Sequence, residues 1–133
     1  MEELRVLAPG EVGAIGETLA ARHLRRHGYR VLYRNFRPTR GGEIDIICRD
    51  VALGELVFVE VKTRTSEVLG RPADAVDREK QRRLAKGAMA WLRLLDHPPI
   101  RFRFDVVEVV LGCNRPKIEV LRDAFTLPEP MRY

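Results

Sequence analysis

The sequence predicts a single domain that mixes α-helices and β-strands, in the order helix, three strands, helix, and one or two strands. Two observations predict this order: apolar residues recur at helical spacing in two segments, and short runs rich in Ile, Val and Phe lie between and after them. With 133 residues, of which 45% are hydrophobic, the chain can form one domain with a normal core. We therefore expect one domain over residues 1–133, with its core at about residues 11–125.

Two segments have the pattern of amphipathic helices. The first runs from Glu11 to His27 and is followed by Gly28, a residue common at helix C-termini. The second runs from about Asp77 to Leu95, before two prolines that cannot continue a helix. The apolar stripes consist of Val12, Ile15, Leu19, Ala20 and Leu24 in the first helix and of Leu84, Ala88, Trp91, Leu92 and Leu95 in the second.

The remaining apolar runs predict strands, because β-branched and aromatic residues favour a pleated backbone. They are Tyr29–Phe36, Ile44–Ile47, Leu56–Val61, Arg101–Leu111 and the shorter Lys117–Leu121. Turn-forming residues at 38–42 predict a loop, and the polar, glycine-containing stretch 63–72 predicts a second loop that is mobile beside the candidate site.

Three charged residues interrupt two of these apolar runs. Asp45 lies in the second predicted strand, and Glu60 and Lys62 lie in or directly after the third. Since successive side chains of a strand alternate between its faces, Glu60 and Lys62 point the same way, roughly 7 Å apart, and the valines between them point the other way. We expect one face of this strand to be core and the other to carry chemistry.

These three residues have the pattern of a metal-dependent nuclease site. Two carboxylates on neighbouring strands can bind one hard divalent cation such as Mg²⁺ or Mn²⁺. A lysine two residues after a ligand can orient the attacking water and offset charge that develops on a phosphodiester. The alternative for a Glu-x-Lys triplet is an exposed ion pair of little energetic weight, and the apolar run around Glu60 and Lys62 favours the site.

Two polar residues fall in or beside the predicted helical stripes. Glu17 lies seven residues before Leu24, about 20° away around the helix axis, and so at the edge of the buried face. It either reaches water or caps a neighbour, or it is a third acidic group beside the metal. Gln81 lies one turn before Leu84, and because a buried amide is costly without partners, we expect it to form a hydrogen bond near the start of its helix.

The charge balance favours polyanionic partners. Lys and Arg number 24 and Asp and Glu 19, which gives a net charge of +5 and a pI near 9.7. Four cations without acidic partners lie on one face of the second predicted helix, which is either a solvated face or a track for phosphates. The candidate nucleic-acid contacts are Arg40 and Arg64, which flank the segment with Asp45, Glu60 and Lys62, and Arg82, Arg83 and Lys86 on this helix face. The fourth cation of the face is Arg93.

The sequence has neither the pattern of a signal peptide nor an apolar run long enough to span a membrane, so we expect a cytoplasmic protein without a membrane partner. Cys48 and Cys113 are isolated and are expected to be buried small hydrophobic residues. His23 and His27 lie among arginines, which favours solvent exposure over metal binding.

Several stretches together resemble the YraN family of small bacterial proteins, from about Gly13 to Phe125. They are Gly16-Glu17, Gly28-Tyr29, Arg34-Asn35-Phe36-Arg37, Gly42-Glu43-Ile44-Asp45, Phe58-Val59-Glu60-Val61-Lys62-Thr63-Arg64, Lys80 and Arg103-Phe104-Asp105-Val106-Val107. That family is similar to the restriction-endonuclease-like superfamily and, within it, to the archaeal Holliday junction resolvases.

The resemblance implies an α/β domain with a restriction-endonuclease-like three-layer core, in which a mixed central sheet is flanked by helices. It assigns the metal carboxylates to Asp45 and Glu60, the catalytic lysine to Lys62 and a supporting helical glutamate to Glu17. Gln81 resembles a glutamine that some superfamily nucleases place near the site, although no tyrosine follows it at position 85. Glu43 lies in a matching stretch and is a further candidate for support of the site.

The leading hypothesis is therefore a Mg²⁺-dependent endonuclease that acts on DNA, with branched DNA among the candidate substrates. The alternatives are a non-catalytic nucleic-acid-binding module on the same scaffold and a structural adaptor that binds an acidic protein. Resolvases cut two strands symmetrically, so the resemblance is compatible with a homodimer.

Overall fold

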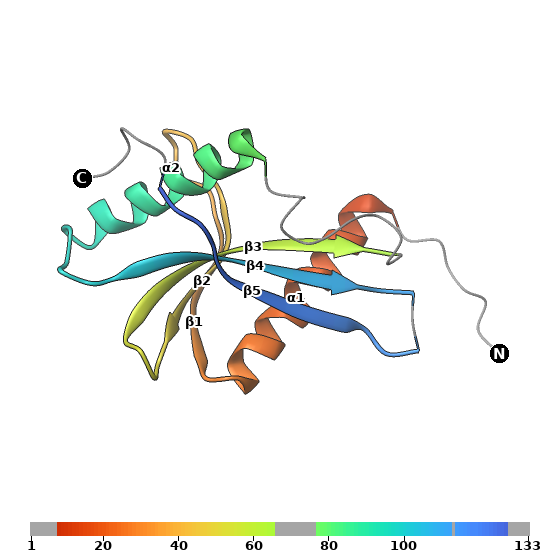
Figure 1. The fold of residues 1–133 in the computed structure, drawn as a ribbon. Coiled ribbons are helices and arrows are strands. Elements are labelled where there is room, and N and C mark those ends of the chain that lie inside the picture. Colours follow the sequence, from red (N-terminus) through yellow and green to blue (C-terminus); the bar gives the residue numbers. More distant parts are fainter. Residues whose placement is uncertain (1–7, 66–76, 113, 128–133) are drawn as a thin grey trace.

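The computed structural model describes residues 8–65, 77–112 and 114–127, which form a five-stranded mixed sheet with one helix on each face (Figure 1). The elements are α1 (Pro9–Arg26), β1 (Tyr29–Phe36), β2 (Ile44–Asp50), β3 (Glu55–Arg64), α2 (Arg78–Leu94), β4 (Phe102–Val110) and β5 (Lys117–Phe125). The strands follow one another across the sheet in chain order. β3 and β4 are parallel and the other neighbours antiparallel, which confirms the α/β fold with a restriction-endonuclease-like three-layer core.

Each face of the sheet packs against one helix, so the domain has two hydrophobic cores. The core under α2 contains Leu84, Ala88 and Leu92 of the helix with Phe36, Ile44, Ile47, Phe58, Phe104 and Val106 of the sheet. The core under α1 contains Ala20, Ala21 and Leu24 with Ile46, Cys48, Val57, Val59, Val61, Val107 and Val109. Strands buried on both faces read as continuous apolar runs, which explains the composition of β3 and β4.

This arrangement corrects the expectation that one face of β3 is core and the other carries chemistry. Val57, Val59 and Val61 face α1 as predicted, but Leu56 and Phe58 are also buried, on the α2 side. By strand alternation Glu60 and Lys62 share this α2 side. The chemistry of β3 is therefore confined to its C-terminal half.

Most element boundaries were predicted to within two residues, and β1 was predicted without error. The predicted loop at 63–72 was wrong at its start, because Thr63 and Arg64 pair with Val109 and Val110 of β4 and so extend β3. Residues 66–76 lie outside the described residues. β5 continues beyond the predicted Leu121 to Phe125, whose ring stacks on that of Phe104 at 4.6 Å.

The predicted stripes are buried only in part. Ile15 and Leu95 are 38% and 46% exposed, since Ile15 lies at least about 100° around the axis of α1 from the buried Ala20 and Leu24, and Leu95 follows the last residue of α2. Trp91 packs edge-on against Phe36, with ring centroids 5.2 Å apart, as its predicted core position requires. Cys48 is buried as predicted, whereas Cys113 lies outside the described residues.

The predicted exposure of the histidine pair is correct for His27, while His23 is half-buried. Their rings stack with centroids 4.0 Å apart. Among the described residues, no helix is long and apolar enough to cross a membrane.

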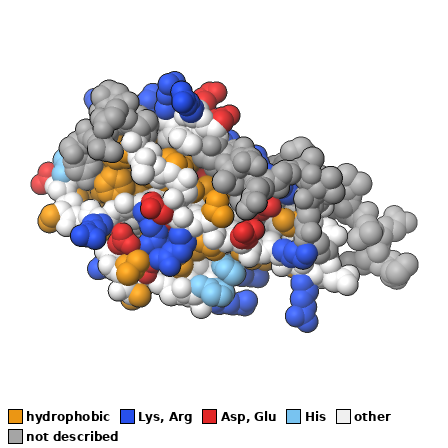
Figure 2. Space-filling model, in the orientation of Figure 1, with side chains coloured by type: hydrophobic (Ala, Val, Ile, Leu, Met, Phe, Trp, Pro, Cys, Tyr) orange, Lys and Arg blue, Asp and Glu red, His pale blue; other side chains and the backbone are white. Residues whose placement is uncertain are grey.

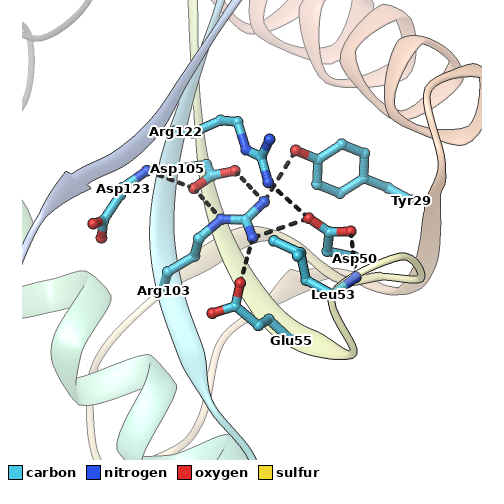
Figure 3. A network of polar contacts seen from close by, with 8 residues as sticks. All are labelled: Tyr29, Asp50, Leu53, Glu55, Arg103, Asp105, Arg122 and Asp123. Carbon is cyan, nitrogen blue, oxygen red and sulfur yellow. Dashed lines mark hydrogen bonds and ion pairs between the residues drawn. The ribbon is translucent and has the colours of Figure 1, made fainter.

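A buried polar cluster joins all five strands at one end of the sheet (Figure 3). The guanidinium group of Arg103, in β4, donates hydrogen bonds to Tyr29 of β1, Asp50 of β2, Glu55 of β3 and Asp105 of β4. Arg122 of β5 adds a second donor to Asp50, at 2.9 Å. We call these six residues the Arg103 cluster, and because its charges are paired and hydrogen-bonded, the cluster is structural.

Candidate functional site

The candidate site lies at the opposite end of β2 and β3, where their regular pairing stops. The last residue pair of the antiparallel ladder is Ile46 with Val59, and extending the register by one step sets Asp45 opposite Glu60. Instead of a backbone carbonyl, the side-chain oxygen Oδ2 of Asp45 accepts a hydrogen bond from the N–H of Val61 at 2.8 Å. The Asp45 carboxylate is thus fixed beside Glu60 by the backbone of β3.

Burial and charge repulsion act together on Asp45. Burial is the largest cause, and the nearby Glu60 carboxylate is the second, of an increase in the pKa of Asp45 to about 7. The hydrogen bond from Val61 opposes this increase without cancelling it. Two acids held this close favour either a shared proton or a bound cation.

Glu60 is 7% exposed and receives its charge partner from the other layer of the fold. The ammonium nitrogen Nζ of Lys80, in the first turn of α2, lies 3.3 Å from its Oε1. Burial raises the pKa of Glu60, while the charges of Lys80 and Lys62 oppose the increase. The side chain of Asp77 caps α2 by accepting a hydrogen bond from the N–H of Lys80 at 2.9 Å, which fixes the start of the helix over β3.

Lys62 lies two residues beyond Glu60 on the same side of β3, as predicted, and is half-buried. Its charge acts on Glu60, so the two groups are close enough to interact. An ammonium group in this position can orient a water molecule or offset negative charge beside the carboxylates.

Glu17 reaches the same region from α1, on the other side of the sheet. Helix α1 approaches β3 closely at Gly16, where any Cβ would overlap the side chain of Thr63, so only glycine fits. The Oε1 atom of Glu17 is buried and has no hydrogen-bond partner among the described residues. Burial, followed by the Asp45 charge, raises its pKa.

The side-chain oxygens of the site are the type of ligand that a hard divalent cation prefers. Asp45 and Glu60 offer oxygen ligands from adjacent strands, and Glu17 offers a buried acceptor oxygen that no protein donor satisfies. Within residues 8–65, 77–112 and 114–127, no three His, Cys, Asp or Glu side chains form a ready-made metal site. Mg²⁺ needs no such cage, because it commonly uses one or two carboxylates and keeps several waters.

The two predicted supporting residues differ in their relation to the site. The charge of Glu43 raises the pKa values of Asp45, Glu60 and Glu17, so Glu43 belongs to the acidic cluster. Gln81 is half-buried, and its backbone N–H donates to the carbonyl of Asp77 at 2.9 Å. Lys80, next to Gln81 in α2, contacts Glu60 instead. From the sequence, Lys80 was identified only among the residues that match the family. Because Lys80 lies four residues before the core residue Leu84, its spacing was a signal that it faces the sheet.

The predicted basic residues divide into two groups. Arg82, Arg83 and Lys86 are exposed on α2, and Arg40 is exposed in the loop before β2. Arg64 is instead in an ion pair with Glu108, at 3.3 Å and with both side chains 9% exposed, so a phosphate would have to compete with Glu108 for it. On the face seen in Figure 2, the described Lys and Arg side chains are interspersed with Asp and Glu.

Comparison with known proteins identifies the family. Residues 16–109 match the model of the uncharacterised protein family UPF0102. The chain belongs to the UPF0102 family, which is the YraN family that the sequence motifs resemble. The matched region contains Glu17, Asp45, Glu60, Lys62 and Lys80, and therefore the whole candidate site.

UPF0102 proteins of several organisms match most of this chain. A UPF0102 protein of Geobacter metallireducens is 47% identical over 116 residues, which cover 87% of this chain and 93% of the relative. Another, of Chlorobaculum tepidum, is 51% identical over 125 residues, covering 89% and 94%. A third, of Rhodococcus opacus, is 47% identical over 116 residues, covering 86% and 95%. The similarity thus extends over nearly the full length of these relatives.

Proposed function

We propose that this UPF0102 protein is a divalent-metal-dependent endonuclease that hydrolyses phosphodiester bonds in DNA, with branched DNA among its substrates. The observation that carries the proposal is the meeting of Asp45 and Glu60 at the end of the β2–β3 ladder, with Lys62 beside them. A structural strand end has no need of two mutually repelling carboxylates, one of them buried and the other half-buried.

In this proposal Asp45 and Glu60 would hold Mg²⁺ or Mn²⁺, and Glu17 would support them. When bound, such an ion would supply positive charge beside the scissile phosphate and would make the attacking water more acidic. Lys62 orients that water and offsets the charge that develops on the phosphate. Val61 keeps the Asp45 carboxylate in place through its N–H, so the position of this ligand depends on the backbone of β3.

A cleavage assay tests the proposal directly. The substrates are labelled single strands, duplexes, flaps and four-way junctions of DNA, with matching RNA, each in Mg²⁺, Mn²⁺ or EDTA. The native chain should cut at least one DNA substrate only with metal, and Asp45→Asn and Glu60→Gln should each reduce the rate by orders of magnitude. Glu119→Gln, which removes an exposed carboxylate from β5, is the matched control and should leave the rate unchanged.

The alternative is a nucleic-acid-binding module without catalysis, which the exposed cations of α2 would also support. It predicts metal-independent binding of the same substrates and no cleavage in any arm of the assay. Cleavage that persists equally in both site variants would identify a contaminant and would remove the support for an enzyme.

A further inference from the structure

A groove with two adjoining cavities separates the loop before β2 from the C-terminal half of α2. The cavities have volumes of about 390 Å³ and 230 Å³ and share two lining residues, Arg40 and Arg93. The larger is also lined by Phe36, Pro38, Thr39, Ala90 and Leu94, and the smaller by Gly41, Lys86 and Met89. We call this feature the Arg40–Arg93 groove.

The groove is a fixed part of the fold. Gly42, with a φ of +98°, meets Gly87 of α2 so closely that a Cβ at Gly42 would overlap the helix backbone. Next to this contact, the N–H of Glu43 donates to the carbonyl of Arg83 at 3.2 Å. The loop therefore rests on α2 through backbone contacts (Figure 1), and these hold the two walls of the groove together.

The lining combines apolar surface with positive charge. Phe36, Pro38 and Leu94 contribute apolar surface to the larger cavity. Arg40, Lys86 and Arg93 contribute cations, and none of the described lining residues is acidic. A phosphate with an adjacent unstacked base has the complementary pattern, because the phosphate pairs with cations and the base face covers apolar surface. A continuous duplex offers its phosphates but keeps its base faces stacked.

One edge of the groove lies near the candidate site. Gly41 lines the smaller cavity, and Asp45 follows four residues later. Four residues span at most about 14 Å even when fully extended, so the Gly41 edge of the groove lies within about four base steps of Asp45 along a stacked strand. A strand held in the groove could therefore extend to Asp45.

We infer that the Arg40–Arg93 groove binds an unpaired nucleotide of a nucleic-acid strand a few nucleotides away from the bond to be cut. The phosphate lies among Arg40, Lys86 and Arg93, and the base covers the apolar surface formed with Leu94. This inference rests on the proposed function for its choice of a nucleic-acid ligand, and it makes frayed, flapped or branched DNA the preferred substrate over continuous duplex.

Fluorescence anisotropy in Ca²⁺ measures this preference in a binding assay. The two probes are a short duplex and the same duplex with a single-stranded tail. One stacked base contributes about 1–3 kcal/mol, so the native chain should bind the tailed probe about 5- to 150-fold more tightly. Equal affinity for the two probes would overturn the inference.

Two pairs of variants test the two surfaces of the groove. Leu94→Ser should reduce the preference for the tailed probe at least about 5-fold, whereas Leu53→Ser, at an exposed leucine in the β2–β3 turn, should not change it. Arg40→Gln should weaken binding of both probes, whereas Arg49→Gln, at an exposed position of β2 remote from the groove, should not. Identical behaviour within either pair would overturn the inference.

The outcome separates the groove from the proposed nuclease. If the chain prefers the tailed probe but does not cleave DNA in Mg²⁺, the result supports nucleotide binding in the groove and contradicts the proposed nuclease. If it cleaves DNA without preferring the tailed probe, the result supports the nuclease and contradicts the groove. Displacement of the tailed probe by poly-glutamate at equal charge concentration would assign the groove to an acidic protein instead.

Discussion

The ammonium group of Lys80 lies 3.3 Å from a carboxylate oxygen of Glu60, so a residue of α2 partly neutralises the acidic site on β3. A divalent cation that binds Glu60 must compete with this ammonium group. Lys80 therefore lowers the affinity of the site for metal while stabilising it in the metal-free protein. The negative charge of the site is thus partly offset before any ligand binds.

The first prediction is that Lys80→Gln tightens metal binding. Removing one partly exposed competing charge is worth about 1 kcal/mol, so the Mn²⁺ concentration that gives a fixed increase in melting temperature should fall roughly 5-fold. Thermal melts titrated with Mn²⁺ at pH 8 measure this. Lys86→Gln removes an exposed cation of the same helix and should leave that concentration unchanged; if it behaves like Lys80→Gln, the effect reflects net charge alone.

The second prediction concerns Asp45 and pH. Because its pKa rises from 3.8 to about 7 on folding, the folded state holds a proton that the unfolded state releases between these pH values. The contribution to stability is complete below about pH 4 and is lost as pH rises through 7, by at most about 4 kcal/mol. In EDTA, Asp45→Asn should therefore melt several degrees above the native chain at pH 8.

The difference between the two chains should vanish near pH 4, where Asp45 is protonated in both states. Glu119→Gln, at an exposed carboxylate, serves as the control and should follow the native profile. The pKa of Asp50 shifts in the opposite direction, because hydrogen bonds from Leu53 and Arg103 outweigh its burial and lower it. The contribution of Asp50 to stability therefore has the opposite pH dependence. A native stability that is flat from pH 5 to pH 8 in EDTA would contradict the assignment for Asp45.

The third prediction is that the Arg103 cluster stabilises the fold independently of the candidate site. Arg103→Met removes the guanidinium group that Asp50, Glu55 and Asp105 share and should cost about 3–5 kcal/mol in urea unfolding. Arg122→Gln removes a donor whose side chain is 54% exposed and should cost less than about 1 kcal/mol. Each variant that folds should retain the Mn²⁺-induced increase in melting temperature of the native chain. Equal losses of unfolding free energy in the two variants would contradict a special role of Arg103.

Sequence reasoning located the candidate carboxylates because their signal is local: an acidic residue inside an apolar strand is unusual wherever the strand packs. The pattern of apolar residues along β1 and the two helices is also local, so these elements were predicted as well. It did not find the contact between Lys80 and Glu60, since that contact depends on how α2 crosses the sheet. The Arg103 cluster was missed because it requires the register of five strands, although Arg103 and Asp105 in an otherwise apolar strand were a visible signal.

The fourth prediction addresses the cations of α2. If Arg82, Arg83 and Lys86 contact phosphates, replacing all three by alanine should weaken binding equally across DNA sequences and reduce the salt slope by roughly three. Affinities at several salt concentrations measure the slope. The matched control removes Arg22, Arg25 and Arg26, which are exposed on α1. Equal slopes for the two triple variants would assign the α2 cations to an ordinary solvated face.

The fifth prediction separates an enzyme from a binding module through Lys62. In the proposed nuclease its ammonium group acts mainly in the transition state, so Lys62→Ala should reduce cleavage by orders of magnitude while affinity stays within a few-fold. In a binding module Lys62 is one more phosphate contact, and its loss weakens affinity modestly with no cleavage to lose.

The comparison uses four-way-junction affinity in Ca²⁺ and cleavage in Mg²⁺ or Mn²⁺ for the native, Lys62→Ala and Glu60→Ala chains. Lys117→Ala, which removes an exposed lysine at the start of β5, controls for the loss of one positive charge. Because Lys62 shares one side of β3 with Glu60, a loss of cleavage confined to Lys62→Ala and Glu60→Ala localises the chemistry to this end of the strand. Activity that survives both substitutions belongs to another protein in the preparation.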